Sequence, residues 1–258
     1  MLRFFKQRLK RALYAARGLK PDIKIPVTTV NPGDQAWYFA DGTLKEGDIV
    51  YSLGLATNIE FDLNLIEKFG VEVHGFDPTP ESVEWVRSQS LPPQFHHHAV
   101  AVAGHDGELT FQLPEKEGHC ARAIGASDQK PEVRPQTPDL RSLTSELRTL
   151  TSDSRPSTLD PRPSTLTVPC KLISTLMRDL GHSRINLLKM DIEGSEYDVI
   201  DDILTNNLEV GQILVEFHHR FADIGMKKTL TAVAALRAAG YELFHISPWC
   251  EEYAFIKE

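Results

Sequence analysis

The carboxylates most suited to chemistry gather in residues 185–204, INLLKMDIEGSEYDVIDDIL. An apolar run ending at Met190 has the length and character of a parallel strand that is buried on both faces. Asp191 and Glu193 follow the run directly, on a tight turn that Gly194 permits. In open α/β sheets, ligands bind beyond the carboxyl ends of the strands. We therefore predict that Asp191 and Glu193 take part in chemistry.

The same turn leads into a predicted helix that begins at Ser195, a residue type favoured at N-caps. Glu196 and Asp198 fall in the first helical turn, where the helix dipole favours negative charge. Helix capping is therefore a sufficient explanation for these two acids. It is the alternative explanation for Asp191 and Glu193 as well, although their place on the turn favours chemistry.

A second pair of candidates ends another apolar strand, predicted over residues 211–220. Glu216 and His218 are two residues apart, so they project on the same side of the strand, at the sheet edge that also holds Asp191. Either group can accept a proton, and the ordinary pKa of imidazole suits a base near neutrality. His218 also has a structural interpretation, as a histidine whose hydrogen bonds are satisfied inside the fold.

A β-α-β unit precedes these segments, with strands predicted over 48–54 and 71–77 and a helix over 58–70. Such a unit suits an adenosine cofactor, because a small-residue turn at Gly54 admits a ligand and Asp77 can accept bonds from ribose hydroxyls. The turn lacks the GxGxxG pattern, which favours a cofactor without phosphates. The alternatives are an ordinary strand-to-helix turn at Gly54 and a helix N-cap at Asp77.

The remaining periodicity predicts one α/β domain over residues 21–258. Its further elements are helices over 80–89, 171–181, 195–206 and 227–240, strands within 95–104 and over 107–114, and a closing strand pair at 241–247 and 252–258. Between about 127 and 167 the chain is rich in proline, serine and threonine and carries near-repeats. We predict a flexible low-complexity insertion there, with order returning at Val168.

Residues 1–20 contain seven basic residues and no acidic one, and their apolar residues recur near one helical face. The predicted amphipathic helix is too short and too charged to span a bilayer, and it lacks the apolar core of a secretory signal. Two interpretations stay open. The helix lies on an anionic membrane surface, or it packs against the domain.

Composition limits the remaining classes. The net charge of −8, carried by a body more acidic than the whole chain, argues against a nucleic-acid partner. The three cysteines lack metal-ligand spacing and indicate a reducing, cytoplasmic compartment, with membrane association only through residues 1–20. The triplet at 96–98, three consecutive histidines, does not predict a metal site, because adjacent strand residues point to opposite faces.

Four segments resemble the FkbM-type S-adenosylmethionine-dependent methyltransferases, and within them the methyltransferase-like 24 group. They are VYSLGLATNIEFD, HGFDPTP, LLKMDIEGSEYDVI and LVEFHH. The resemblance covers about residues 47–115 and 168–258. It implies a class I methyltransferase (Rossmann-like) fold, with a mostly parallel seven-stranded sheet, an antiparallel last strand and helices on both faces. It also implies transfer of a methyl group from S-adenosyl-L-methionine to a hydroxyl oxygen.

The resemblance also implies roles for individual residues. Gly54 and its neighbours hold the methionine part of the cofactor, Asp77 holds the ribose, and Asp191 lies beside the methyl donor. The implied cofactor-binding residues are Ser52, Gly54, Ala56, Asn58, Asp77, Pro78, Ala101 and Asp191. The sequence departs from the family at Ala56 and Asn58, where relatives often have glycine and an acid.

Methyl transfer to a hydroxyl requires orientation of the two reactants and removal of a proton. The predicted catalytic residues are Asp191, Glu193, Glu216 and His218. The predicted acceptor is a small molecule or a glycan. In a variant of this scheme, Asp191, Glu193 and Glu216 hold a magnesium ion that polarises the hydroxyl. Two alternatives are a catalytically silent module that binds S-adenosylmethionine or a partner, and a nicotinamide oxidoreductase, which the missing GxGxxG disfavours.

Overall fold

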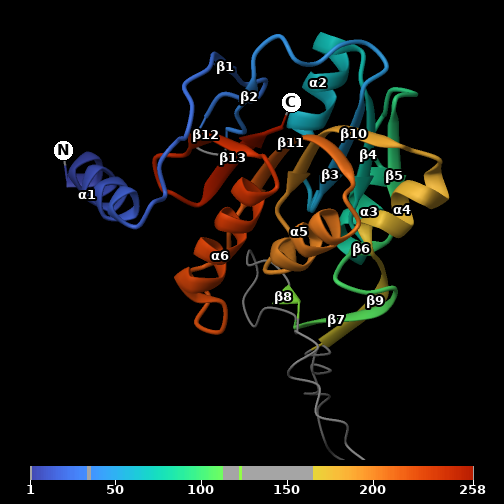
Figure 1. The fold of residues 1–258 in the computed structure, drawn as a ribbon. Coiled ribbons are helices and arrows are strands. Elements are labelled where there is room, and N and C mark those ends of the chain that lie inside the picture. Colours follow the sequence, from blue (N-terminus) through green and yellow to red (C-terminus); the bar gives the residue numbers. More distant parts are fainter. Residues whose placement is uncertain (1, 34–35, 113–121, 124–164, 258) are drawn as a thin grey trace, which may run out of the picture.

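A computed structural model describes residues 2–33, 36–112, 122–123 and 165–257 (Figure 1). Its main sheet contains, in spatial order, β12 (Glu242–Ile246), β13 (Glu252–Ile256), β11 (Glu209–Glu216), β10 (Arg184–Met190), β3 (Ile49–Leu53), β4 (Glu72–Phe76) and β5 (Phe95–His98). Strands β11, β10, β3, β4 and β5 are parallel to one another. Strand β13 runs antiparallel to both β11 and β12. The predicted seven-stranded sheet with an antiparallel last strand is confirmed.

Helices cover both faces of this sheet. One face carries α4 (Ile173–Leu180), α5 (Glu196–Thr205) and α6 (Gly225–Ala238), and the other carries α2 (Glu60–Phe69) and α3 (Pro80–Arg87). Along β10, Leu188 and Met190 pack into the core under α4, α5 and α6, whereas Leu187 packs into the core under α2. Both faces of β10 are buried, which explains why its sequence is an apolar run without polar alternation.

A second, smaller sheet lies below the main one in Figure 1. Its strands, in spatial order, are β6 (Ala101–Val102), β9 (Thr165–Lys171), β7 (Gly107–Gln112) and β8 (Arg122–Ala123). We expected one strand within 95–104 that ends near Ala101 and Val102. The segment instead forms two strands, because the chain leaves the main sheet after His98 and β6 pairs with β9. Strand β9 also begins before Val168, where we expected order to return. Residues 127–164 of the predicted insertion lie outside the described residues.

The N-terminal part forms α1 (Leu2–Ala16) and a short hairpin of β1 (Val27–Thr28) and β2 (Phe39–Ala40). Helix α1 projects from the side of the domain, as Figure 1 shows in blue. One face of the helix contacts the domain through Tyr14, whose hydroxyl lies 2.9 Å from Nε2 of His219, and through Lys10, which pairs with Glu251. The side chains of Leu9 and Leu13 remain 53% and 55% exposed. Among the described residues, no helix is long and apolar enough to cross a bilayer.

Four histidines gather on one face of the sheet beside β4 and β5. His74 stacks on His96 and on His98, and its Nδ1 lies 3.0 Å from Nε2 of His98. His182 packs edge-on against the ring of His74. His97 contacts a different group, since its Nε2 lies 3.3 Å from the backbone carbonyl oxygen of Asp77. Burial, reinforced by the neighbouring histidines, lowers the pKa of His74 to about 3 and that of His98 to about 4.

Candidate functional site

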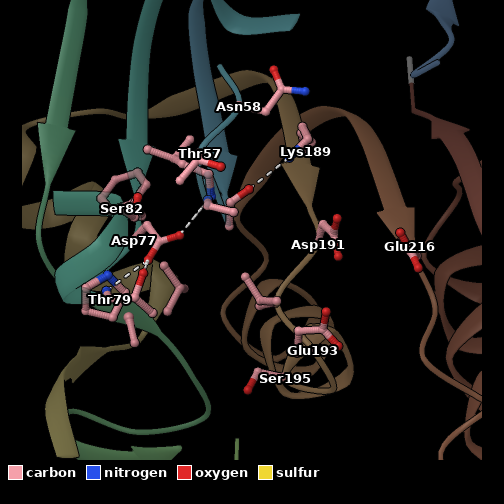
Figure 2. Close-up of a pocket in the computed structure, with 18 of the residues that line it drawn as sticks. Thr57, Asn58, Asp77, Thr79, Ser82, Lys189, Asp191, Glu193, Ser195 and Glu216 are labelled. Carbon is pink, nitrogen blue, oxygen red and sulfur yellow. Dashed lines mark hydrogen bonds between the residues drawn. The ribbon is translucent and has the colours of Figure 1, made fainter. Parts of the chain in front are cut away.

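A cleft of about 540 Å³ opens at the carboxyl ends of β3, β4, β10 and β11 (Figure 2). Of the predicted cofactor-binding residues, the cleft is lined by Gly54, Ala56, Asn58, Asp77, Pro78, Ala101 and Asp191. Ser52 does not line the cleft, since its side chain is completely buried within β3. The edge of the sheet that we predicted from strand direction is therefore the edge where these side chains meet.

Gly54 permits a close approach between two strand ends. Its φ angle is +80°, and a Cβ built at this position would lie 1.8 Å from the backbone oxygen of Asp191. The N–H of Asp191 in turn donates to the carbonyl of Leu53. The end of β3 and the end of β10 thus pack backbone against backbone, and any side chain at position 54 would separate them.

Asp77 ties the loop after β3 to the turn after β4. One carboxylate oxygen accepts hydrogen bonds from the backbone N–H groups of Leu55 and Ala56, at 3.1 and 2.8 Å. The other oxygen accepts from the N–H and the hydroxyl of Thr79, at 2.9 and 2.6 Å. Figure 2 shows Asp77 facing the cleft from this position. These four hydrogen bonds engage both oxygens, so the carboxylate shapes the cleft wall.

The departures from the family in the first loop have structural counterparts. Ala56 adopts a φ angle of +46°, in the left-handed region that favours glycine. Asn58 accepts a hydrogen bond of 2.9 Å from the N–H of Glu60 through its side chain, at the start of α2. This bond satisfies one of the N–H groups that a helix leaves unpaired at its N-terminus.

The four predicted catalytic residues meet at the opposite end of the cleft. Asp191, Glu193 and Glu216 line the cleft, and Figure 2 shows them grouped across from Asp77. His218 is completely buried behind them. Its Nε2 lies 3.2 Å from Glu193, 3.7 Å from Asp191 and 3.7 Å from Glu216. We call these four residues the His218 cluster.

Glu196 completes the surroundings of His218. Its carboxylate is fully buried and lies 2.8 Å from Nδ1 of His218. The same carboxylate accepts hydrogen bonds from the N–H groups of Ile192 and Gly194, so its position is fixed by the turn. The sequence does not reveal this role, because an acid in a first helical turn is already explained by capping.

Charges within the His218 cluster shift one another's protonation. Burial raises the pKa of Asp191. Burial and the nearby Asp191 raise the pKa of Glu216 to about 7, against the opposing effect of Arg220 at 2.7 Å. Burial alone would lower the pKa of His218, but Glu193 and Glu196 outweigh it and raise that pKa to about 10. Glu216 is therefore a carboxylic acid of the cleft whose pKa is raised to near neutrality.

Lys189 brings a positive charge to the cleft and was not singled out in the sequence, since it lies within the apolar run of β10. Its ammonium donates a 3.1 Å hydrogen bond to the carbonyl of Gly54 (Figure 2) and lies 5.0 Å from the ring centre of Trp37. Burial raises the pKa of Asp62, and the charge of Lys189 works against this rise. Lys189 thus balances part of the negative charge around the cleft.

Comparisons with known proteins agree with the geometry. The model of the FkbM methyltransferase domain matches residues 54–243. The fold is similar to the solved fibrillarin pre-rRNA processing protein of Methanococcus jannaschii, with 8% identity, a TM-score of 0.45 and coverage of 93% of this chain and 86% of that one. It is also similar to Aeropyrum pernix fibrillarin in complex with S-adenosyl-L-methionine, with 9% identity, a TM-score of 0.37 and coverage of 83% and 66%.

Similarity at this level concerns the fold and not the function. No curated protein matches the sequence significantly. The family match begins at the loop after β3 and ends within β12, so it includes the carboxyl ends of β4, β10 and β11 at the cleft. The chain therefore belongs to the FkbM methyltransferase domain family and is an S-adenosylmethionine-dependent methyltransferase.

Proposed function

We propose that this protein transfers the methyl group of S-adenosyl-L-methionine to a hydroxyl oxygen of a small molecule or glycan. The observation that supports the proposal is the division of the cleft into two ends, with Asp77 at one and the carboxylates of Asp191, Glu193 and Glu216 at the other. A carboxylate suits the ribose hydroxyls, and negative charge suits a sulfonium ion. We also propose, from the segments that resemble it, that the chain belongs to the methyltransferase-like 24 group.

The cofactor lies, in this proposal, along the loop after β3. Asp77 accepts hydrogen bonds from the ribose, and the backbone around Gly54 and Ala56 holds the methionine part. Ala101 lines the cleft together with Leu109 and Phe111 of the smaller sheet. These apolar side chains suit the flat, apolar faces of an adenine ring. Asp191 then lies nearest to the sulfonium.

Glu216 is the base in our proposal. It accepts the hydroxyl proton of the acceptor, the oxygen attacks the methyl carbon, the carbon–sulfur bond breaks, and S-adenosylhomocysteine leaves. His218 has the more suitable ordinary pKa, but it lies behind the carboxylates and its pKa is raised to about 10, so we do not assign it the role of the base. The magnesium variant, with Asp191, Glu193 and Glu216 as ligands, places the ion in this same cluster.

A mass-spectrometric assay tests the proposal. The protein is incubated with metabolite and glycan extracts and either ordinary or trideuteromethyl S-adenosylmethionine. We expect a product heavier than its precursor by 14 mass units with the ordinary donor and 17 with the labelled one. Binding of S-adenosylmethionine in calorimetry, with no S-adenosylhomocysteine released under any condition, would favour the silent binding module. A dinucleotide that stabilises the protein against heat where S-adenosylmethionine does not would favour the oxidoreductase.

We also propose that α1 contacts an anionic membrane surface from the cytoplasmic side. Leu9 and Leu13 are exposed on a helix that also exposes Lys6, Arg8 and Arg11. Such a combination suits lipid headgroups of negative charge. The protein should sediment with phosphatidylserine vesicles but not with phosphatidylcholine vesicles. Leu9→Ser with Leu13→Ser should abolish this, whereas Ala12→Ser, at an exposed small residue of the same helix, should not. Equal sedimentation of the double variant would contradict the proposal.

A further inference from the structure

Three side chains of the His218 cluster converge on one point. Ligand atoms of Asp191, Glu193 and His218 all lie within 4.8 Å of one another. From Nε2 of His218, the carboxylate oxygens of Glu193 and Asp191 are 3.2 and 3.7 Å away. Two ligands of one ion, with bonds of about 2.1 Å, are separated by about 3–4 Å. The spacing is therefore that of side chains that share a metal ion.

His218 distinguishes this cluster from an ordinary group of acids. It is completely buried, its Nδ1 lies 2.8 Å from the Glu196 carboxylate, and its Nε2 faces the carboxylates of Glu193 and Asp191. Its Nδ1 side faces Glu196, which the turn holds in place through two backbone N–H groups. A histidine that is oriented by a carboxylate on one nitrogen and directs the other nitrogen outward is the usual arrangement of a metal ligand.

The backbone at Glu193 adds an independent observation. Glu193 has a φ angle of +52°, which is unfavourable for a residue with a side chain. The next residue, Gly194, also has a positive φ, of +112°. Strain of this kind persists where the surroundings impose it and is concentrated at functional sites. The carboxylate of this residue lies 3.2 Å from Nε2 of His218.

We infer that Asp191, Glu193 and Nε2 of His218 bind a divalent first-row transition-metal ion, with Glu196 as the residue that orients His218. The ligand set differs from the magnesium set expected from the sequence, because His218 replaces Glu216. Magnesium prefers oxygen ligands, whereas a set of one imidazole and two carboxylates suits manganese, iron, cobalt or zinc. Glu216 remains outside the set, with its carboxylate held 2.7 Å from Arg220.

The metal ion would also assist the proposed methyl transfer, and this part of the inference rests on the proposed function. An ion held by Asp191, Glu193 and His218 would increase the acidity of an acceptor hydroxyl at the cleft wall. Glu216 would take the proton of that hydroxyl, the oxygen would attack the methyl carbon, and the sulfur would keep the electron pair of the broken bond. Metal binding itself requires no acceptor and no methyl transfer.

The competing explanation needs no ion. A protonated His218 would itself supply the positive charge that balances the surrounding carboxylates. A direct binding measurement separates the two explanations. A protonated imidazole cannot bind a metal, so metal binding requires that the ion displace the proton of His218.

Manganese binding to the purified, chelator-treated full chain decides between them. Free Mn²⁺ is followed by its electron paramagnetic resonance signal during titration at pH 7.5, in the absence of S-adenosylmethionine. We expect one Mn²⁺ per chain, with Mg²⁺ competing at least tenfold more weakly. His218→Ala and Asp191→Asn should each weaken binding more than tenfold, and Glu196→Gln about tenfold or more. Asp198→Asn, which changes an exposed acid of the same helix, should change the affinity less than twofold, and Glu216→Gln should weaken binding less than Asp191→Asn does.

Three outcomes would overturn the inference. They are no saturable Mn²⁺ binding by the folded wild type, unchanged binding in both His218→Ala and Asp191→Asn, and loss of binding in Glu216→Gln together with preference for Mg²⁺. Circular dichroism and thermal unfolding establish that each variant is folded, and Asp191→Asn serves if His218→Ala is not. Saturable Mn²⁺ binding without any methylated product would count against the proposed function and leave the metal site standing.

Discussion

The carboxylate of Asp77 accepts a 2.8 Å hydrogen bond from the backbone N–H of Ala56. This bond joins the ends of two neighbouring strands, β3 and β4, across the part of the cleft that we assign to the cofactor. The backbone of Ala56, which donates this bond, has a left-handed conformation with a φ angle of +46°. The pair therefore links cofactor binding to the stability of the loop, and the two effects can be separated by experiment.

Replacing Asp77 with alanine should weaken S-adenosylmethionine binding by well over tenfold. Two hydrogen bonds from the ribose to a charged acceptor are worth about 1.5–3 kcal/mol each, and 1.4 kcal/mol corresponds to a factor of ten. Calorimetry measures the affinity, and thermal unfolding reports the separate loss of the loop contacts. Asp41→Ala, at an exposed turn, is the control. Unchanged affinity in a folded Asp77→Ala protein would refute the ribose assignment.

Ala56→Gly should stabilise the protein by about 1 kcal/mol. A residue with a Cβ is strained in the left-handed region by about 1–2 kcal/mol, and part of this gain is offset by the greater freedom of glycine in the unfolded chain. Urea unfolding measures the change. Ala234→Gly, at an exposed position of α6, should have the opposite sign and destabilise by about 1 kcal/mol. A destabilised Ala56→Gly protein would show that the alanine side chain is needed there.

Glu216→Gln should lower the rate of methyl transfer by about 10²–10⁴ and leave S-adenosylmethionine affinity nearly unchanged. The base must be ionised to accept a proton, and the pKa of Glu216 is raised to about 7. The wild-type rate should therefore be full above pH 7 and fall about tenfold per pH unit below it. Glu209→Gln, at the other end of β11, is the matched control. Full activity in Glu216→Gln would move the base to Glu193 or Asp191.

The buried His74 should make folding stability fall at acidic pH. Its pKa is lowered to about 3 in the folded protein, so the unfolded chain binds the proton first as pH falls below about 6.5. Stability is thus complete above pH 6.5 and is lost progressively toward pH 3. A histidine that stays neutral at pH 5 accounts for about 2 kcal/mol of that loss.

Urea unfolding at pH 7.5 and pH 5 measures this dependence. His74→Phe keeps an aromatic ring in the stack and should show a shallower loss of stability than the wild type. His105→Gln, at an exposed histidine, should keep the wild-type dependence. An identical loss in His74→Phe and the wild type would assign the acid sensitivity to other groups.

The sequence by itself determined the main sheet and the edge where the site lies. The segments 49–53, 184–190 and 209–216 are mostly apolar because helices cover both faces of their strands. Glycines such as Gly70 and Gly181 mark helix ends in a left-handed conformation. These are local patterns, so a single chain displays them. The carboxyl ends of parallel strands then necessarily bring Asp77, Asp191 and Glu216 to one edge.

The tertiary structure alone decided the smaller sheet. Strand β9 pairs with β7, so that Val168 lies opposite Leu109. The proline-rich sequence before β9 gives no indication of this pairing. The same holds for the division of 95–104 between two sheets. Strand pairing between distant segments is fixed by which surfaces remain to be covered, and periodicity along one segment does not record this.

Only the tertiary structure decided which charged groups are buried together. Glu196 and Asp198 are indistinguishable as first-turn acids, yet Glu196 is fully buried against His218 and Asp198 is half exposed. His218 was expected to face a ligand and lies behind three carboxylates instead. The ionisation of a side chain depends on its burial and on charges within a few ångströms. In this protein those charges come from residues 191–196, between β10 and α5, and from residues 216–218 at the end of β11, two segments that the fold brings to one point.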